Sequence, residues 1–134
     1  MKRTLGLLVA FALSTSTLLS GCNTLADARA AKGTGPSRVY AVNQDIVWAA
    51  LPSVVQSAGL DYVGDNHAEG YALAQHAISA FSYGENVAIF VEQGPRPNST
   101  RVEVDSKRTL ATNITAKNWE NVILDGLSAR FPAD

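Results

Sequence analysis

Residues 86–106 read NVAIFVEQGPRPNSTRVEVDS, two segments of alternating hydrophobicity on either side of a proline-rich turn. Successive side chains of a strand point to opposite faces, so the alternation predicts strands over 86–93 and 100–106. Two prolines and a glycine predict a loop over 94–99. The side chains predicted to face the core are Val87, Ile89, Val91, Val102 and Val104. Those predicted to face water are Arg101, Glu103 and Asp105. The sheet is therefore expected to have one wet face.

Three further segments predict strands. SRVYAV (37–42) and YALAQHA (71–77) both alternate between apolar and polar residues. DYVGDNHAEG (61–70) is expected to start as a short strand and then to run into a polar turn, because Gly, Asp and Asn favour turns.

A first helix is predicted between Asn43 and Gly59, where apolar residues recur at helical spacing. Asn43 is a favourable N-cap residue, and Gly59 stands where a C′ glycine belongs. Pro52 should kink the helix, but the apolar face continues on both sides of it, so we expect one bent helix. Its predicted core-facing residues are Val47, Ala50, Leu51, Val54, Val55 and Ala58.

A second helix is predicted near the end of the chain, with Thr115 or Asn118 as its cap. Its apolar stripe consists of Trp119, Val122, Ile123, Leu127 and Phe131. Gly126 lies at the edge of this stripe and costs about 1 kcal/mol relative to alanine in a helix. We therefore expect the helix to approach the sheet closely at Gly126.

The predicted order is β-α-β-β-β-α, in which consecutive strands pair antiparallel. The fold class is expected to be α+β: a single two-layer sandwich, formed by residues 38–134, with two amphipathic helices on one face of the sheet.

The segment before this domain resembles a bacterial lipoprotein leader. Lys2 and Arg3 precede an apolar run that is too short to cross a bilayer, and Leu19-Ser20-Gly21-Cys22 resembles a lipobox. The resemblance implies that residues 1–21 are a signal peptide and that Cys22 carries the lipid. The alternatives for Cys22, a buried structural cysteine or a reactive thiol, require an uncleaved leader.

The residues next to Cys22 indicate a location. Asn23 favours the outer membrane, because an aspartate at this position usually retains lipoproteins in the inner membrane. The domain is expected to face the periplasm, with the inner membrane or the cell surface as alternatives. Residues 22–37 are few in large apolar side chains and are expected to form a flexible tether, with a reach of about 20 Å.

The composition limits the partners. The chain has 11 Lys plus Arg and 12 Asp plus Glu, so removing Lys2 and Arg3 leaves it mildly acidic, which argues against nucleic acid. Cys22 is the only cysteine, so its acylation leaves no thiol for a disulfide. The fold therefore has to rely on its hydrophobic core, and nothing in the sequence calls for a cofactor.

Two clusters could carry a site. Asp65, His67 and Glu69 recur with a period of two, and His76 could join them in a zinc site; the alternative is a solvated hairpin. The second cluster is an aromatic pair that could anchor a partner or pack at the edge of the core. It consists of Phe81 and Tyr83.

Trp48 and Trp119 are expected in the core or at its edge. The serines lack a nucleophile-elbow context, so we do not expect an enzyme.

A family resemblance rests on residues 45–74, DIVWAALPSVVQSAGLDYVGDNHAEGYALA, and on TRVEVDS and WENVILDGLSARF later in the chain. Trp48, Gly59-Leu60 and Gly70 stand as in the repeated domain of the BamC-type lipoprotein of the outer-membrane assembly machinery, and as in small proteobacterial lipoproteins with one such domain. The resemblance implies a helix-grip-like fold. This chain has one domain rather than two.

These observations predict a lipid-anchored, non-catalytic interaction or accessory module that binds an envelope protein, with the exposed edges of its sheet available for strand addition. The alternative is a binder of a small ligand or an envelope polymer, for which Tyr62, Tyr71 or Phe90 would line a pocket between helices and sheet. A metal-dependent enzyme is the third alternative.

Overall fold

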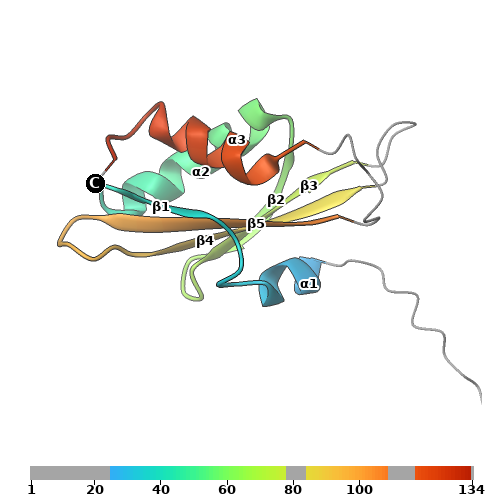
Figure 1. Ribbon diagram of the computed structural model, residues 1–134, viewed down its shortest axis with the longest axis horizontal. Helices are drawn as coiled ribbons and strands as arrows, with labels where there is room; N and C mark the ends of the chain where they lie inside the picture. Colours follow the sequence, from blue (N-terminus) through green and yellow to red (C-terminus); the bar gives the residue numbers. More distant parts are fainter. Residues whose placement is uncertain (1–24, 78–83, 109–116, 134) are drawn as a thin grey trace, which may run out of the picture.

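Figure 1 shows the computed structural model of the chain, in which residues 25–77, 84–108 and 117–133 are described. The strands are β1 (Ser37–Tyr40), β2 (Asp61–Asn66), β3 (Tyr71–His76), β4 (Glu85–Gln93) and β5 (Thr100–Arg108). The helices are α1 (Leu25–Ala30), α2 (Gln44–Ala58) and α3 (Trp119–Ser128). The strands form one antiparallel sheet in the order β1-β5-β4-β3-β2.

The β4–β5 hairpin has the predicted arrangement. The two strands pair from Glu85 opposite Arg108 to Gln93 opposite Thr100. The predicted loop between them closes through a hydrogen bond of 2.8 Å from the Gly94 amide to the Ser99 carbonyl. This hairpin supplies the two strands on which the other three are arranged.

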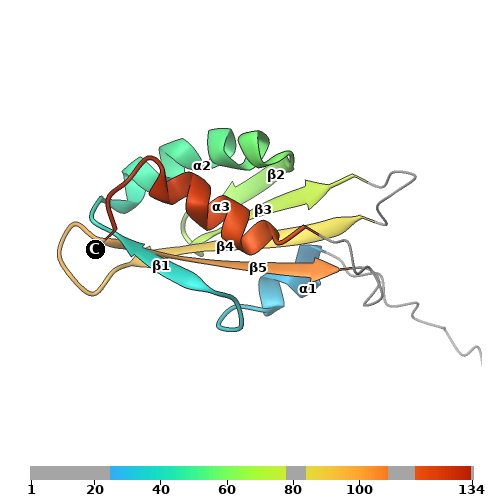
Figure 2. The same ribbon diagram turned by 45° about the horizontal axis from the view of Figure 1, so that its top comes forward.

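The expected fold class is confirmed: α2 and α3 lie side by side on one face of the sheet (Figures 1 and 2). Between these helices and the sheet lies an apolar core. Its fully buried side chains include Val47, Leu51, Val55, Val87, Ile89, Val102, Val104, Ile123 and Leu127. The two tryptophans also belong to it, as predicted.

The order of elements is α-β-α-β-β-β-β-α, which has one strand and one helix more than the predicted β-α-β-β-β-α. Residues 61–66 form a complete strand rather than a short one, because Tyr62 packs against the core and β3 pairs with the strand as far as Asn66. The second difference is α1, which lies on the face of the sheet opposite α2 and α3 (Figure 1).

The α2 helix begins and ends where expected. It runs without interruption through Pro52, in agreement with a single helix, since buried residues precede and follow the proline. Gly59 terminates it at φ 92°, a left-handed conformation that glycine adopts at little cost, and its amide donates to the Gln56 carbonyl. Asn43 occupies the cap position but makes no capping hydrogen bond through its side chain.

The α3 helix is capped by Asn118, whose side chain accepts a hydrogen bond of 3.0 Å from the Asn121 amide. The other candidate cap, Thr115, lies outside the described residues. The expected approach of Gly126 to the sheet is wrong, because the close neighbour is α2. A Cβ at Gly126 would lie 2.9 Å from Cγ1 of Val54, so the missing side chain lets the two helices meet.

The interpretation of residues 22–37 as a flexible tether is wrong from Leu25 onward. Ala28 is buried against Ala88 and Phe90, and Ala31 is also buried. We expected a helix in this segment to lack a packing surface, but the second face of the sheet provides one. Small alanine side chains let the short helix lie close to the strands.

The prediction that one face of the sheet is exposed to solvent is also wrong at β5. Glu103 is 1% exposed and Asp105 is 6% exposed, although the alternation predicted that both would face water. They do point away from the helical layer, but the chain between α1 and β1 covers them.

Replacing Asn118 with alanine should lower the free energy of unfolding by about 0.5–2 kcal/mol, because the Asn121 amide loses its partner. Asn43→Ala is the matched control and should cost less, since no capping bond is lost. Urea denaturation of both variants measures the difference. Equal losses would contradict this account of the caps.

Candidate functional site

The predicted zinc ligands on the β2–β3 hairpin make separate contacts. Nε2 of His67 lies 3.3 Å from Oδ1 of Asp65, and its ring stacks on Trp48 with 4.1 Å between centroids. Glu69 instead forms an ion pair with Arg29 of α1. The hairpin thus brings together Asp65 and His67 but not Glu69.

The fourth predicted ligand, His76, lies at the far end of β3, with its ring 5.2 Å from that of Trp119. Within the described ranges no three His, Cys, Asp or Glu side chains are grouped so that they could hold a metal ion. The residues singled out for metal therefore serve packing and ion pairing in this structure.

Two predicted sites lie outside the described residues. The lipobox residues Leu19, Ser20, Gly21 and Cys22 belong to the first 24 residues. The aromatic pair Phe81 and Tyr83 lies in residues 78–83. Lipid attachment and aromatic anchoring both remain predictions.

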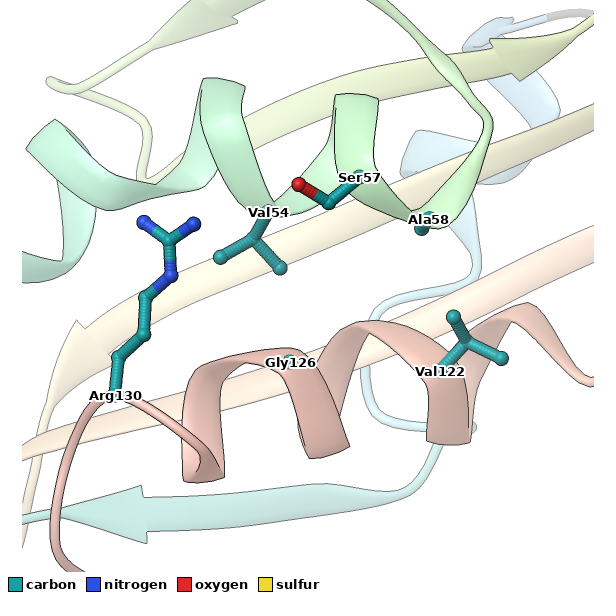
Figure 3. Close-up of a pocket in the computed structure, with 6 residues that line it drawn as sticks. All are labelled: Val54, Ser57, Ala58, Val122, Gly126 and Arg130. Carbon is teal, nitrogen blue, oxygen red and sulfur yellow. The ribbon is translucent and has the colours of Figure 1, made fainter.

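The residues expected to line a ligand pocket do not gather at one place. Tyr62 packs on the helical side of the sheet, whereas Tyr71 and Phe90 belong to the cluster under α1. A hollow does exist between α2 and α3 (Figure 3), with a volume of about 170 Å³. It is smaller than typical ligand sites of roughly 300–1,000 Å³. Its lining residues are Val54, Ser57, Ala58, Val122, Gly126 and Arg130.

The two edges of the sheet differ in accessibility. Residues near the C-terminus cover the end of the short strand β1: Ala133 bridges to Tyr40, and the Ala41 amide donates to the Pro132 carbonyl at 3.2 Å. Across the described part of the chain, β2 pairs only with β3, which leaves its outer edge open. We call this outer edge, residues 61–66, the β2 edge.

The β2 edge is acidic and interrupted. Its exposed residues are Asp61, Val63 and Asp65, and Val63 is 48% exposed. The register with β3 shifts between Tyr62 and Gly64, so Val63 is the extra residue of a bulge. Bulges and charges on an edge strand oppose indiscriminate pairing. A strand that pairs here therefore has to match the bulge and the two carboxylates.

Tyr62 fixes the geometry of this edge. Its hydroxyl donates a hydrogen bond of 2.6 Å to Oδ2 of Asp65. Burial, together with this neighbouring carboxylate, raises the pKa of Tyr62 above its usual value. The phenol therefore stays protonated and holds the Asp65 side chain against the sheet.

A second polar cluster lies at the end of the sheet where β4 begins. Glu85 is 4% exposed, and its Oε2 accepts a hydrogen bond from the Trp119 indole. Oε1 is buried and has no hydrogen-bond partner in the described part of the structure. Lys117 lies 4.8 Å from the Trp119 ring centroid and donates to the Ala58 carbonyl at 3.1 Å. This cluster ties the start of α3 to the end of α2 and to β4.

The segment that covers the second face of the sheet comprises residues 25–36, which we call the strap. Buried carboxylates hold its non-helical part: Glu103 accepts a hydrogen bond from the Gly33 amide, and Asp105 accepts one from the Thr34 hydroxyl. The Pro36 carbonyl accepts a bond of 3.0 Å from the Val104 amide. The strap is thus joined to β5 through both side chains and backbone.

Two cations hold the first part of the strap, Arg29 in α1 and Lys32 in the turn that follows it. Arg29 pairs with Glu69 and lies over the Tyr71 ring, 4.6 Å from its centroid. Lys32 pairs with Glu92, and the hydrogen bond from Lys32 lowers the pKa of the Glu92 carboxyl. These pairs are partly exposed, so each contributes little alone.

Comparison with models of protein families and with curated proteins finds no match. None of the helices in the described ranges is long and apolar enough to span a membrane.

Sequence reasoning missed the strap and the difference between the two edges. One available indication of the strap was the pair of glycines at 33 and 35: Gly35 lies close to the backbone of Val104, and Gly33 adopts φ 93°, a conformation that favours glycine. The contact of Pro132 and Ala133 with the end of β1 had no recognisable sequence pattern, because it depends on where the chain returns after α3.

Replacing Gly35 with alanine should destabilise the protein by about 1–3 kcal/mol, because a Cβ there would overlap the backbone oxygen of Val104. Gly64→Ala is the matched control: a Cβ at Gly64 meets nothing within 4 Å, so that variant should be neutral or slightly stabilised. Urea denaturation compares them. A Gly35→Ala protein as stable as the control would contradict the docked strap.

Acid should weaken the contact between Lys32 and Glu92. The pKa of the Glu92 carboxyl is lower in the folded chain than its ordinary value of 4.5. The charged carboxylate therefore stabilises the fold above pH 4.5, and this stabilisation is lost as the pH falls through the folded-state pKa. Glu92→Gln should therefore lower the free energy of unfolding by less than about 1 kcal/mol at neutral pH, with no deficit in strong acid. Urea denaturation across this pH range measures the deficit; one that is independent of pH would contradict the prediction.

Proposed function

We propose that the protein is a lipid-anchored envelope protein whose single domain is a non-catalytic interaction module that binds a partner by strand addition at the β2 edge. The observation that carries this proposal is the difference between the two edge strands: β1 has only four residues and its last one, Tyr40, bridges to Ala133, whereas the six residues of β2 pair on one side only in the described part of the chain. An open edge offers backbone donors and acceptors in a row to an extended segment.

The chemistry of the β2 edge restricts the partner. Asp61 and Asp65 give the edge negative charge on either side of the exposed Val63. A complementary segment carries basic side chains near the two carboxylates and an apolar side chain near Val63, since like charges across a strand pair are unfavourable. The partner is therefore an envelope protein with an extended, basic segment.

The anchor in this proposal is Cys22, and its support is the lipobox sequence Leu19-Ser20-Gly21-Cys22. Asn23 supports the outer membrane, with the domain facing the periplasm. Acylation at several positions gives a stable anchor, because each buried CH₂ contributes about 0.8 kcal/mol.

A non-catalytic role agrees with how the candidate acid–base groups are used. His67 stacks on Trp48, and Glu69 pairs with Arg29. The hollow between α2 and α3 is small and lined mainly by apolar groups, with Arg130 donating to Ser53 at its rim. These packing and ion-pair contacts support the proposal of a non-catalytic role.

A photo-crosslinking residue at Val63 tests the proposal in intact cells that express the full chain. Ile46 on α2 is the matched control, since Val63 is 48% exposed and Ile46 is 47% exposed. We expect Val63 to crosslink to one extended, basic segment of one envelope protein, identified by mass spectrometry. Ile46 should not crosslink to that segment.

Charge reversal supplies the second arm of the test. Asp61→Lys should reduce the crosslink from Val63 several-fold, because it repels a basic segment. Asp45→Lys reverses another exposed aspartate, in the first turn of α2, and should leave the crosslink unchanged. Crosslinks of equal yield from both positions, or a Val63 crosslink that is insensitive to Asp61→Lys, would rule out strand addition at this edge.

A further inference from the structure

The docked strap leaves only a few residues between the proposed anchor and the start of the docked chain. The α1 helix begins at Leu25, three residues after Cys22. Three residues span at most about 11 Å when fully extended. A free segment over 22–37 would instead allow a mean excursion of about 20 Å and a maximum near 50 Å.

The direction of α1 is set by its contacts with β4. Ala28 packs on Ala88 and Phe90, and four residues later Lys32 pairs with Glu92. The helix therefore runs in the same direction as β4, so that its first residue lies toward the end of the sheet where β4 begins. In Figures 1 and 2 α1 lies on the second face of the sheet, nearer the end at which β5 finishes and α3 starts.

We propose that this end of the sheet faces the phospholipid bilayer and that the strap fixes the orientation of the domain; this rests on the proposed lipid anchor at Cys22. The end is defined by His76, Glu85, Arg108 and Trp119, where β3 ends, β4 begins, β5 ends and α3 begins. The opposite end, with the β4–β5 turn, points away from the membrane. The nine residues of β4 separate the two ends by roughly 30 Å.

The strap has enough contacts to keep this orientation. Ala28 and Ala31 are buried, and Arg29 and Lys32 form ion pairs. The residues that follow them form hydrogen bonds with the buried carboxylates of Glu103 and Asp105. Releasing the strap would leave the Glu103 carboxylate without two of its amide donors, Gly33 and Gly35. These hydrogen bonds, together with the apolar contacts of Ala28, oppose release of the strap.

This orientation restricts where the partner of the β2 edge is located. The β2 strand runs antiparallel to β3, so it starts at the membrane-facing end and extends away from it. The whole β2 edge then lies within a few tens of ångströms of the bilayer. The basic segment that pairs with it belongs to a protein in the same membrane or lying against it.

Spin labels on the lipidated full chain test the orientation. The chain is reconstituted into vesicles of phosphatidylethanolamine and phosphatidylglycerol that contain a lipid-bound nickel chelate. One label replaces Lys107, near the proposed membrane-facing end, and the other replaces Pro97 in the exposed β4–β5 turn. Relaxation by nickel should be several-fold stronger at position 107.

Matched variants on α1 connect the result to the strap. Ala28→Glu places a charge in the buried contact with Ala88 and Phe90 and should make relaxation at the two positions alike. Ala30→Glu adds the same charge at an exposed position and should preserve the difference.

The outcomes separate the two proposals. Flotation of the vesicles measures anchoring independently of orientation. If the protein does not float with the vesicles, the anchor and the orientation are both overturned. If it floats but relaxation is equal at positions 97 and 107, or Ala28→Glu leaves the difference unchanged, the orientation alone is overturned.

Discussion

The backbone pairing of β4 with β5 is the constraint on which the rest of the structure depends. These are the longest strands of the sheet, and they are paired along their full length, from Glu85 to Gln93 on one side and from Arg108 to Thr100 on the other. Each serves as the template for a neighbour, β3 on β4 and β1 on β5. Both layers then pack on this central pair, with α2 and α3 on one face and the strap on the other.

The sequence predicts those parts of the fold that are local. The alternation on either side of residues 94–99 is enough for the hairpin, and Gly59 and Asn118 mark helix ends through the conformation or hydrogen bond that each residue type favours. The predicted zinc cluster shows the limit of this approach: period-two spacing places side chains on one face only while the chain stays extended, and β2 ends at Asn66.

The remaining features depend on contacts between distant segments. The sequence around Ala28 gives no sign that this residue is buried, because its packing partners, Ala88 and Phe90, lie on a distant strand. Glu103 is expected from the alternation to face water, and its burial follows only from the position of the strap. Gly126 was correctly associated with a close approach, but the choice of α2 over the sheet depends on the relative position of two helices. The sequence does not predict that the β2 edge is open, because this depends on the order of strands in the sheet. The negative charge of the β2 edge, in contrast, follows directly from Asp61 and Asp65.

Under the proposed export and anchoring at Cys22, the strap also has a consequence for the order of events. Its contacts join residues far apart in the chain, such as Gly33 and Glu103, and closing so long a loop is slow compared with forming the hairpin. Until β5 has emerged, residues 25–36 have no surface to dock on, and the proposed lipidation of Cys22 would take place in this period. Once docked, the same cysteine stays within about 11 Å of α1. For the proposed anchor, late closure of the strap would leave a period for lipidation and cleavage before the domain takes its final position.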